Sequence, residues 1–203
     1  MKAGMMAAIF AALATGGCMT TPRAGPVDVT RFHLGTAIAP GTISVEPLRT
    51  TDTVSPEYRT YAAAAERELT RLGYSVAPTG TTSQYIAALS FTRTTLGAVQ
   101  RPSPFSIGLG AGGGSFGRRG GGVGLGGGLA LPIGRGRTDS VIGSELAVQI
   151  RRRADGTTLW EGRAVTEGVA RADATQPLAS ADRLARAMFR EFPGDSGITT
   201  TVR

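Results

Sequence analysis

The 203-residue sequence contains one cysteine and one histidine, and its only lysine is Lys2. One cysteine, Cys18, and one histidine, His33, cannot supply the His/Cys ligand set of a zinc site, so we predict no metal. A catalytic histidine also needs an orienting carboxylate and a nucleophile, and no G-x-S-x-G motif occurs. We therefore expect no catalytic residues and no cofactor, and we read His33 as a strand residue in a non-enzymatic protein.

No apolar run reaches the roughly 20 residues that a membrane-spanning helix needs. The apolar segment Ala3–Ala14 follows the charged Lys2 and ends at Thr15-Gly16-Gly17, a pattern typical of an export signal. Two cleavage sites compete. Cleavage after Ala12-Leu13-Ala14 would release a soluble protein, whereas cleavage before Cys18 would leave the cysteine at the mature N-terminus.

The segment Thr15-Gly16-Gly17-Cys18 resembles the lipobox of bacterial lipoproteins. The resemblance implies that Cys18 carries a diacylglyceryl thioether and an acylated amino group, which together anchor the chain in a membrane. A free thiol would be unusual in an oxidising compartment, and lipidation removes it. Met19 is not Asp, so similarity to the enterobacterial sorting rule favours the outer membrane, facing the periplasm. A soluble periplasmic protein is the alternative.

The full chain has a net charge of +7, and apart from Lys2 its lysine and arginine positions are all arginine. Either an anionic partner or the codon bias of a GC-rich genome accounts for this. Nucleic acid does not suit an exported protein, whereas arginine makes forked contacts with the phosphates of anionic lipid or lipopolysaccharide. The candidate contacts are Arg118, Arg119, Arg151, Arg152 and Arg153. A solvated strand end also explains the last three.

Hydrophobic periodicity predicts an α+β fold, mostly antiparallel, with two helices packed on one face of the sheet. Ser55, Pro56 and Glu57 are typical of a helix start. The expected helices are Ser55–Leu72 and about Pro177–Phe192. The expected strands are Val27–Leu34, Thr42–Pro47, Tyr74–Val76, Tyr85–Thr95, Glu145–Arg152 and Thr157–Val169.

Half of the 30 glycines lie between Phe105 and Arg137. The tract contains G-x-G-x-x-G, but more glycine follows each match where a nucleotide site needs a helix, so we reject a phosphate-binding loop. Apolar residues alternate with glycine, as at Ile107 and Leu109. The tract is either a glycine-rich hairpin or an insertion without fixed structure.

These observations divide the chain into four parts. Residues 1–17 are the signal peptide and residues 18–26 a flexible tether. Residues 27–198 are one domain with a Gly-rich insertion at about 101–137, and residues 199–203 are a tail.

Several motifs in order resemble a family of bacterial envelope lipoproteins known as domain of unknown function 4136. They are the lipobox-like TGGC, Tyr58–Tyr61 (YRTY), Leu72–Val76 (LGYSV), Ala87–Phe91 (AALSF), Glu145–Ile150 (ELAVQI), Asp155–Gly162 (DGTTLWEG) and Ala187–Pro193 (AMFREFP). The resemblance implies an α+β fold and a lipid anchor, and it supplies no catalytic residues.

We therefore expect a lipid-anchored envelope protein that binds or scaffolds another envelope component, either a protein or anionic lipid. The alternative is a periplasmic carrier of a small or lipidic ligand. A carrier predicts an enclosed apolar cavity, and a scaffold predicts a packed core with an exposed patch.

Overall fold

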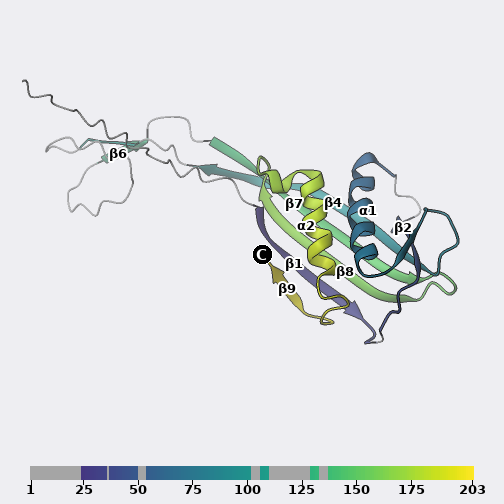
Figure 1. Cartoon of the computed structure of the whole chain (residues 1–203). Coiled ribbons are helices and arrows are strands. Elements are labelled where there is room, and N and C mark those ends of the chain that lie inside the picture. The colour runs from purple at the N-terminus through teal and green to yellow at the C-terminus, as the bar shows by residue number, and fades with distance from the viewer. Residues whose placement is uncertain (1–23, 36, 50–53, 102–105, 110–128, 133–136) are drawn as a thin grey trace, which may run out of the picture.

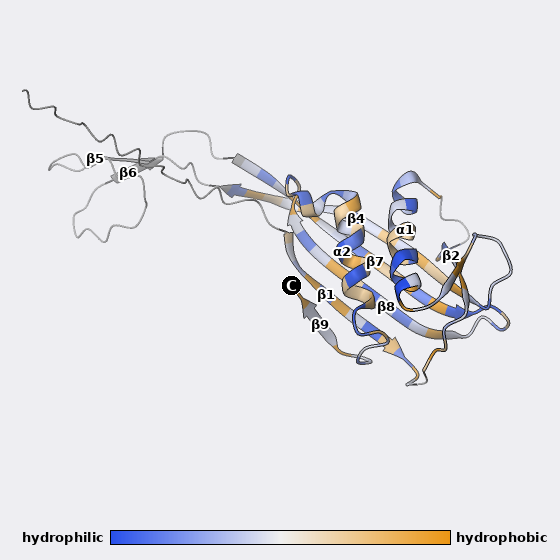
Figure 2. Ribbon diagram, in the orientation of Figure 1, coloured by the Kyte–Doolittle hydropathy of each residue, from blue (hydrophilic) through white to orange (hydrophobic). Residues whose placement is uncertain are grey.

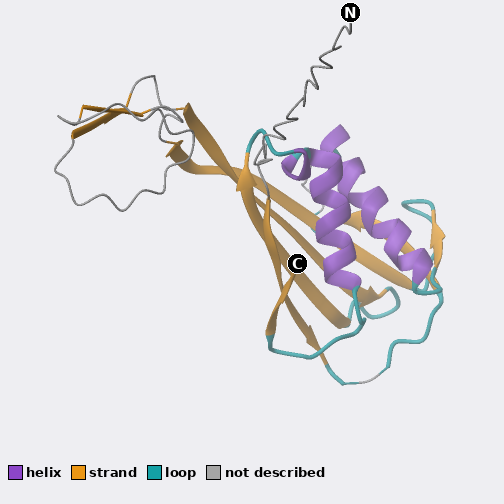
Figure 3. Ribbon diagram, turned by 60° about the vertical axis from the view of Figure 1, so that its left-hand side comes forward, coloured by secondary structure: helices purple, strands orange, loops and turns teal. Residues whose placement is uncertain are grey.

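The computed structural model describes residues 24–35, 37–49, 54–101, 106–109, 129–132 and 137–203. The expected signal peptide, Cys18, Arg118 and Arg119 lie outside these residues. Within them, seven strands form one sheet in the order β3-β2-β4-β7-β8-β1-β9, and two strands form a second sheet. Two helices lie on the same face of the large sheet (Figure 1 and Figure 3). The α+β class and the two-helix layer are confirmed.

The strands of the large sheet are longer at its centre than at its edges. Figure 2 shows hydrophobic and hydrophilic residues alternating along them, as a sheet with one buried face requires. The strands are β1 (Ala24–His33), β2 (Thr42–Pro47), β3 (Ser75–Ala77), β4 (Tyr85–Arg101), β7 (Arg137–Arg152), β8 (Thr158–Val169) and β9 (Thr199–Val202).

Strand β2 is the exception to the antiparallel pattern, because it pairs in parallel with both β3 and β4. Helix α1 (Pro56–Arg71) makes the crossover between β2 and β3, as parallel neighbours require. This βαβ unit was not expected from the sequence. All other pairs in the large sheet are antiparallel.

The two helices run in the same direction across the sheet. Helix α2 spans Pro177–Phe189 and follows the short 3₁₀ helix η1, Asp173–Thr175. Near their C-terminal ends, the Arg71 Nη2 of α1 donates to the Phe189 carbonyl at 3.3 Å. The Ser55 hydroxyl caps the start of α1 by accepting from the Tyr58 N–H at 3.0 Å, as the sequence predicts.

The core lies between the helices and the sheet, and Trp160 on β8 is its largest fully buried side chain. Its ring stacks on Phe189 at a centroid distance of 5.5 Å, and its Nε1 donates to the Pro193 carbonyl at 3.0 Å. Gly162 makes room for the ring, because a Cβ there would lie 2.2 Å from Trp160 Cη2. The WEG motif therefore encodes both the anchor and the space beside it.

Several element boundaries differ from those expected. Strand β1 begins at Ala24, inside the expected tether, and the expected tail is strand β9, which pairs with β1. Strands β4 and β7 are longer than expected and remain paired to Arg101 and Arg137. Helix α2 ends at Phe189 because Arg190 is extended and Glu191 has a φ of 57°.

Two short strands within the Gly-rich tract pair with each other. They are β5 (Ser106–Leu109) and β6 (Leu129–Pro132), and Ile107 lies opposite Leu131 in their antiparallel register. The expected turn at 112–122 lies outside the described residues. The choice between a glycine-rich hairpin and an unstructured insertion therefore stays a prediction for the tract as a whole.

Candidate functional site

The arginine triplet predicted as an anionic contact lies where β7 turns into β8. Each of its members has a partner within the chain. Arg151 Nη2 donates to Gln149 Oε1 at 2.6 Å, and Arg152 Nη1 lies 2.8 Å from Asp155 Oδ2. Arg153 reaches further and joins three segments that are distant in the sequence.

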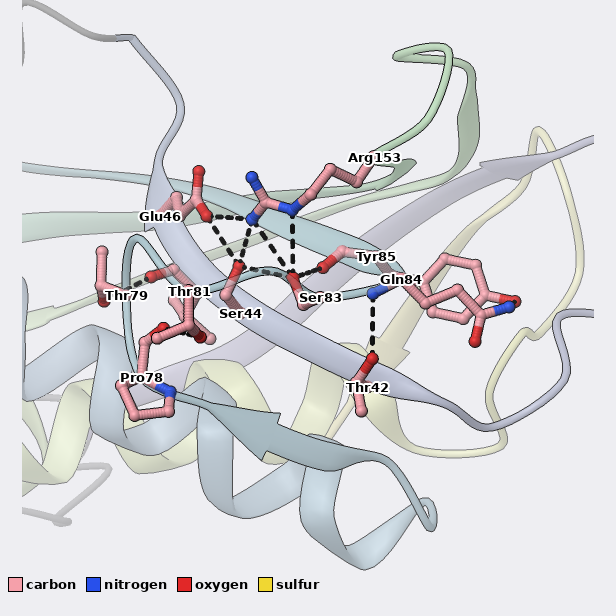
Figure 4. Close-up of polar contacts among 11 residues, drawn as sticks. Thr42, Ser44, Glu46, Pro78, Thr79, Thr81, Ser83, Gln84, Tyr85 and Arg153 are labelled. Atoms are coloured by element: carbon pink, nitrogen blue, oxygen red, sulfur yellow. Dashed lines mark hydrogen bonds and ion pairs between the residues drawn. The ribbon is translucent and has the colours of Figure 1, made fainter.

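We call Arg153, Glu46, Ser44 and Ser83 the Arg153 clamp (Figure 4). Arg153 Nη2 pairs with the Glu46 carboxylate and donates to Ser44 Oγ at 2.7 Å, while its Nε donates to Ser83 Oγ at 3.2 Å. Ser44 Oγ itself donates to Glu46 Oε1 at 2.7 Å. The clamp therefore joins β2, the segment before β4 and the β7–β8 turn.

Glu46 is held in its ionised form by this arrangement. Burial raises its pKa, but the hydrogen bonds from Ser44 and Arg153 outweigh burial and lower the pKa of Glu46 below its ordinary value. An external phosphate at Arg153 would compete with a carboxylate already in place. The clamp therefore serves mainly to connect segments of the fold. Contact of the arginine triplet with an anionic surface stays a prediction.

His33 has both ring nitrogens engaged with the backbone. Its Nδ1 accepts from the Gly35 N–H at 3.1 Å, and its Nε2 lies 2.9 Å from the Gly194 carbonyl. Because a carbonyl only accepts, Nε2 carries the proton and donates to it. Neither nitrogen faces a nucleophile in these contacts. Among the described residues, no group of three or more His, Cys, Asp or Glu could hold a metal ion.

A shallow pocket of about 250 Å³ opens where β2 ends beside β4. It is smaller than the roughly 300–1,000 Å³ that ligand sites usually offer. Its lining combines apolar and polar side chains: Leu48, Arg49, Tyr58, Leu89, Ser90, Phe91 and Thr92.

No helix of the described residues is long and apolar enough to cross a membrane.

The far half of β4 lacks a neighbouring strand on one side. Strand β2 accompanies β4 only from Tyr85 to Leu89, so from Ser90 onward the register pairs β4 with β7 alone. Strand β8 ends at Val169, opposite Val141 of β7. Beyond that point β4 and β7 continue as a two-stranded ribbon (Figure 1). We call Leu96–Arg101 with Arg137–Ser140 the arm.

Two arginines that contact distant segments were missed by sequence reasoning. Arg31 is only 4% exposed, and it donates to the carbonyls of Ala187, Met188 and Arg190 at 2.9–3.0 Å. Burial lowers the pKa of Arg31, while Glu191 and Asp195 raise it in part. The available signal is an arginine on the same face of a strand as the apolar Val27 and Val29, since a buried charge needs partners.

The second, Arg93 on β4, lies at the opposite end of the helices. Its Nη2 donates to the Thr175 carbonyl at 2.8 Å, and its Nη1 lies 3.8 Å from Glu57 Oε1 in the first turn of α1. It thus joins the N-terminal ends of α1 and α2 to the sheet. The contact depends on tertiary structure, so periodicity could not reveal it.

The family model described as domain of unknown function DUF4136 matches residues 44–194. The chain belongs to the DUF4136 family. An uncharacterised protein of Zymomonas mobilis is 31% identical over 213 residues, covering 88% of this chain and 80% of the relative. The family expected from the motifs is therefore confirmed, and the described β2, α1, β4, β7, β8 and α2 lie largely within the matched range.

Two solved structures are distantly similar to this DUF4136 chain. A PelC dodecamer from Paraburkholderia phytofirmans has 14% identity and a TM-score of 0.43, covering 80% of this chain and 94% of that one. A PDZ domain protein from Parabacteroides distasonis has 11% identity and a TM-score of 0.47, covering 89% and 39% respectively. These likenesses are too distant to bear on function or assembly.

Proposed function

We propose that this DUF4136 chain is a non-enzymatic bacterial envelope protein, anchored through lipid on Cys18 to the outer membrane and facing the periplasm. Its domain binds or scaffolds another envelope component. The observation that carries the proposal is the only cysteine of the chain, which follows the apolar segment Ala3–Ala14 and stands six residues before Ala24, the first residue of β1.

With a lipid on Cys18, the short connection would keep the domain near the membrane. Each residue of an extended chain spans at most about 3.6 Å, so Cys18 lies within about 22 Å of Ala24. Stable membrane attachment takes more than one acyl chain, and the mature lipoprotein N-terminus carries three. Such a protein keeps its domain close to the membrane surface, where a scaffold acts.

The surface opposite the helices supports a binding role rather than catalysis. No described element covers it (Figure 3). It carries polar pairs such as Glu145 with Arg163 at 2.7 Å and Asp28 with Thr201 at 2.7 Å. Phe32, also on this face, is 55% exposed. Polar pairs around an exposed aromatic residue suit a wet protein interface.

The test is the intact mass of the protein taken from the membrane fraction, compared with Cys18→Ala and with the control Thr20→Ala. The proposal expects a chain that starts at Cys18 and carries acyl groups, and the same mass increment in Thr20→Ala. Cys18→Ala should leave the membrane fraction. An unmodified thiol on a chain that starts at Thr15 would refute the anchor.

The alternative, a carrier of a small or lipidic ligand, has the pocket at the end of β2 in its favour. Native mass spectrometry of the purified domain separates the two functions. A carrier retains a small molecule that denaturation releases, and Ser90→Leu, which narrows the pocket, removes it. A scaffold gives the mass of the polypeptide and its acyl groups alone.

A further inference from the structure

The start of the folded domain and the arm lie at the same end of the sheet. Ala24 lies opposite Gly168, Gly168 opposite Ile142, and Ile142 opposite Thr95, so one row crosses β1, β8, β7 and β4. Strand β1 runs away from this row toward His33. The N-terminal connection therefore enters the domain from the side on which the arm projects.

The arm and the connection have matching reach. From Ile142 to Arg137, β7 advances about 17 Å beyond the row of Ala24, at roughly 3.3 Å per residue, and β4 covers the same distance with one extra residue in a bulge between Thr95 and Gly97. The connection from Cys18 to Ala24 spans at most about 22 Å. A lipid on Cys18 therefore leaves the arm room to lie along the membrane surface, with its base and its end at a similar depth.

The described side chains of the arm suit that surface. Leu96 is 54% exposed and Val99 is 51% exposed. The acid of the arm, Asp139, is buried, and its Oδ2 lies 2.8 Å from Arg171 Nη2. In the sequence, the last register pair of the arm consists of two basic residues, Arg101 and Arg137.

Exposed apolar side chains are found at both ends of the sheet, so they do not by themselves show which end faces the membrane. At the opposite end of the sheet, Leu34 is 76% exposed and Ile198 is 56% exposed. That end carries charges of both signs: the acids Glu191 and Asp195 act on Arg31, and the triplet Arg151–Arg153 lies where β7 turns into β8. Charge therefore does not distinguish the two ends, but distance from the anchor does, because β1 carries the chain about 30 Å from Ala24 to His33 at roughly 3.3 Å per residue.

We propose that the arm lies against the anionic phospholipid surface of the membrane that holds the anchor, with Leu96 and Val99 in contact with lipid. The inference rests on the proposed acylation of Cys18. The anchor supplies a high local concentration, so weak contacts by the arm are enough to orient the domain. The polar sheet face and the Ile198 end then remain accessible to a periplasmic partner.

The test compares two single-cysteine variants, Val99→Cys and Ile198→Cys, which replace side chains of nearly equal exposure at opposite ends of the sheet. The acylated protein is reconstituted in phosphatidylethanolamine and phosphatidylglycerol vesicles that contain a lipid-borne quencher, and a fluorophore is attached to the new thiol. Because the Cys18 thiol is consumed in the thioether, labelling is confined to the new cysteine.

We expect several-fold stronger quenching at position 99 than at position 198. Equal quenching at the two positions, or stronger quenching at 198, would overturn the inference. Intact mass measured on the same sample reports acylation separately, so an unacylated chain refutes the anchor and not the arm. Both positions are exposed, and a thermal unfolding scan of each variant confirms that the fold is retained.

Discussion

The two ends of the large sheet are built differently. At the end that holds His33 and Trp160, side chains from distant segments satisfy backbone carbonyls: Arg31 binds the end of α2, and Trp160 Nε1 binds Pro193. At the arm end, β4 and β7 continue with no other strand of the described chain beside them.

The contrast separates stability from interaction. The end that holds His33 and Trp160 contains buried contacts that hold α2 and β8 together, so its residues should govern the free energy of unfolding. The arm end exposes apolar side chains and strand edges, which soluble proteins usually protect. Substitutions there should leave stability nearly unchanged and alter only what the protein binds.

The largest loss of stability is expected for Trp160→Ala. The side chain is fully buried and stacks on Phe189, so its removal leaves a cavity costing about 3–5 kcal/mol. Denaturant unfolding measures the effect. The control Trp160→Phe keeps an aromatic ring but loses the hydrogen bond to Pro193, and it should cost clearly less. A Trp160→Ala protein as stable as the wild type would contradict the view that this end of the sheet governs stability.

Arg31→Ala should follow, with a loss of about 2–3 kcal/mol. Hydrogen bonds from a charged group are worth roughly 1.5–3 kcal/mol, and those of Arg31 satisfy the last carbonyls of α2. Arg31→Lys keeps the charge but loses the planar guanidinium that donates to several carbonyls at once, so it should recover only part of the lost stability. Equal stability of Arg31→Ala and the wild type would show that water replaces the guanidinium.

The Arg153 clamp should contribute about 0.5 kcal/mol, because its ion pair is partly exposed and screened by solvent. The pKa of Glu46 is lowered in the folded state, so the contribution is present above the unfolded pKa and lost as pH falls through the folded pKa. Glu46→Gln should therefore be less stable than the wild type at neutral pH and equal to it in acid. Unfolding curves at both pH values test this. An unchanged difference in acid would contradict the account.

The smallest effect on stability is expected for Val99→Ser on the arm. The side chain is half exposed and packs against no part of the buried core, so the change should stay within about 0.5 kcal/mol. Thermal unfolding of this variant and of Val148→Ser, a fully buried position on the neighbouring strand, measures the contrast directly. A loss at Val99 as large as at Val148 would show that the arm is part of the core.

Local signals in the sequence were sufficient for much of the fold. The bounds of β2, the Ser55 cap of α1 and the β7–β8 hairpin each follow from alternation, capping and turn residues within a few positions. The buried position of Trp160 also agrees with its place on an alternating strand.

The remainder depends on partners distant in the sequence. Strand β9 is a short polar segment, TTTV, that becomes a strand because β1 offers it an edge. Arg153 appeared to belong to a solvated charge run, and its partners Glu46 and Ser83 lie 107 and 70 residues away. Periodicity reports which face of an element is apolar, not which charged residue another segment will bring to it.

The most direct measurement is amide hydrogen exchange of the acylated protein in detergent and on phosphatidylglycerol-containing vesicles. The account predicts that vesicles slow exchange at 96–101 and 137–140, while exchange at 31–34 and 196–199 stays unchanged. Slowing confined to the His33 end, or no change in the arm, would contradict the orientation proposed for this protein.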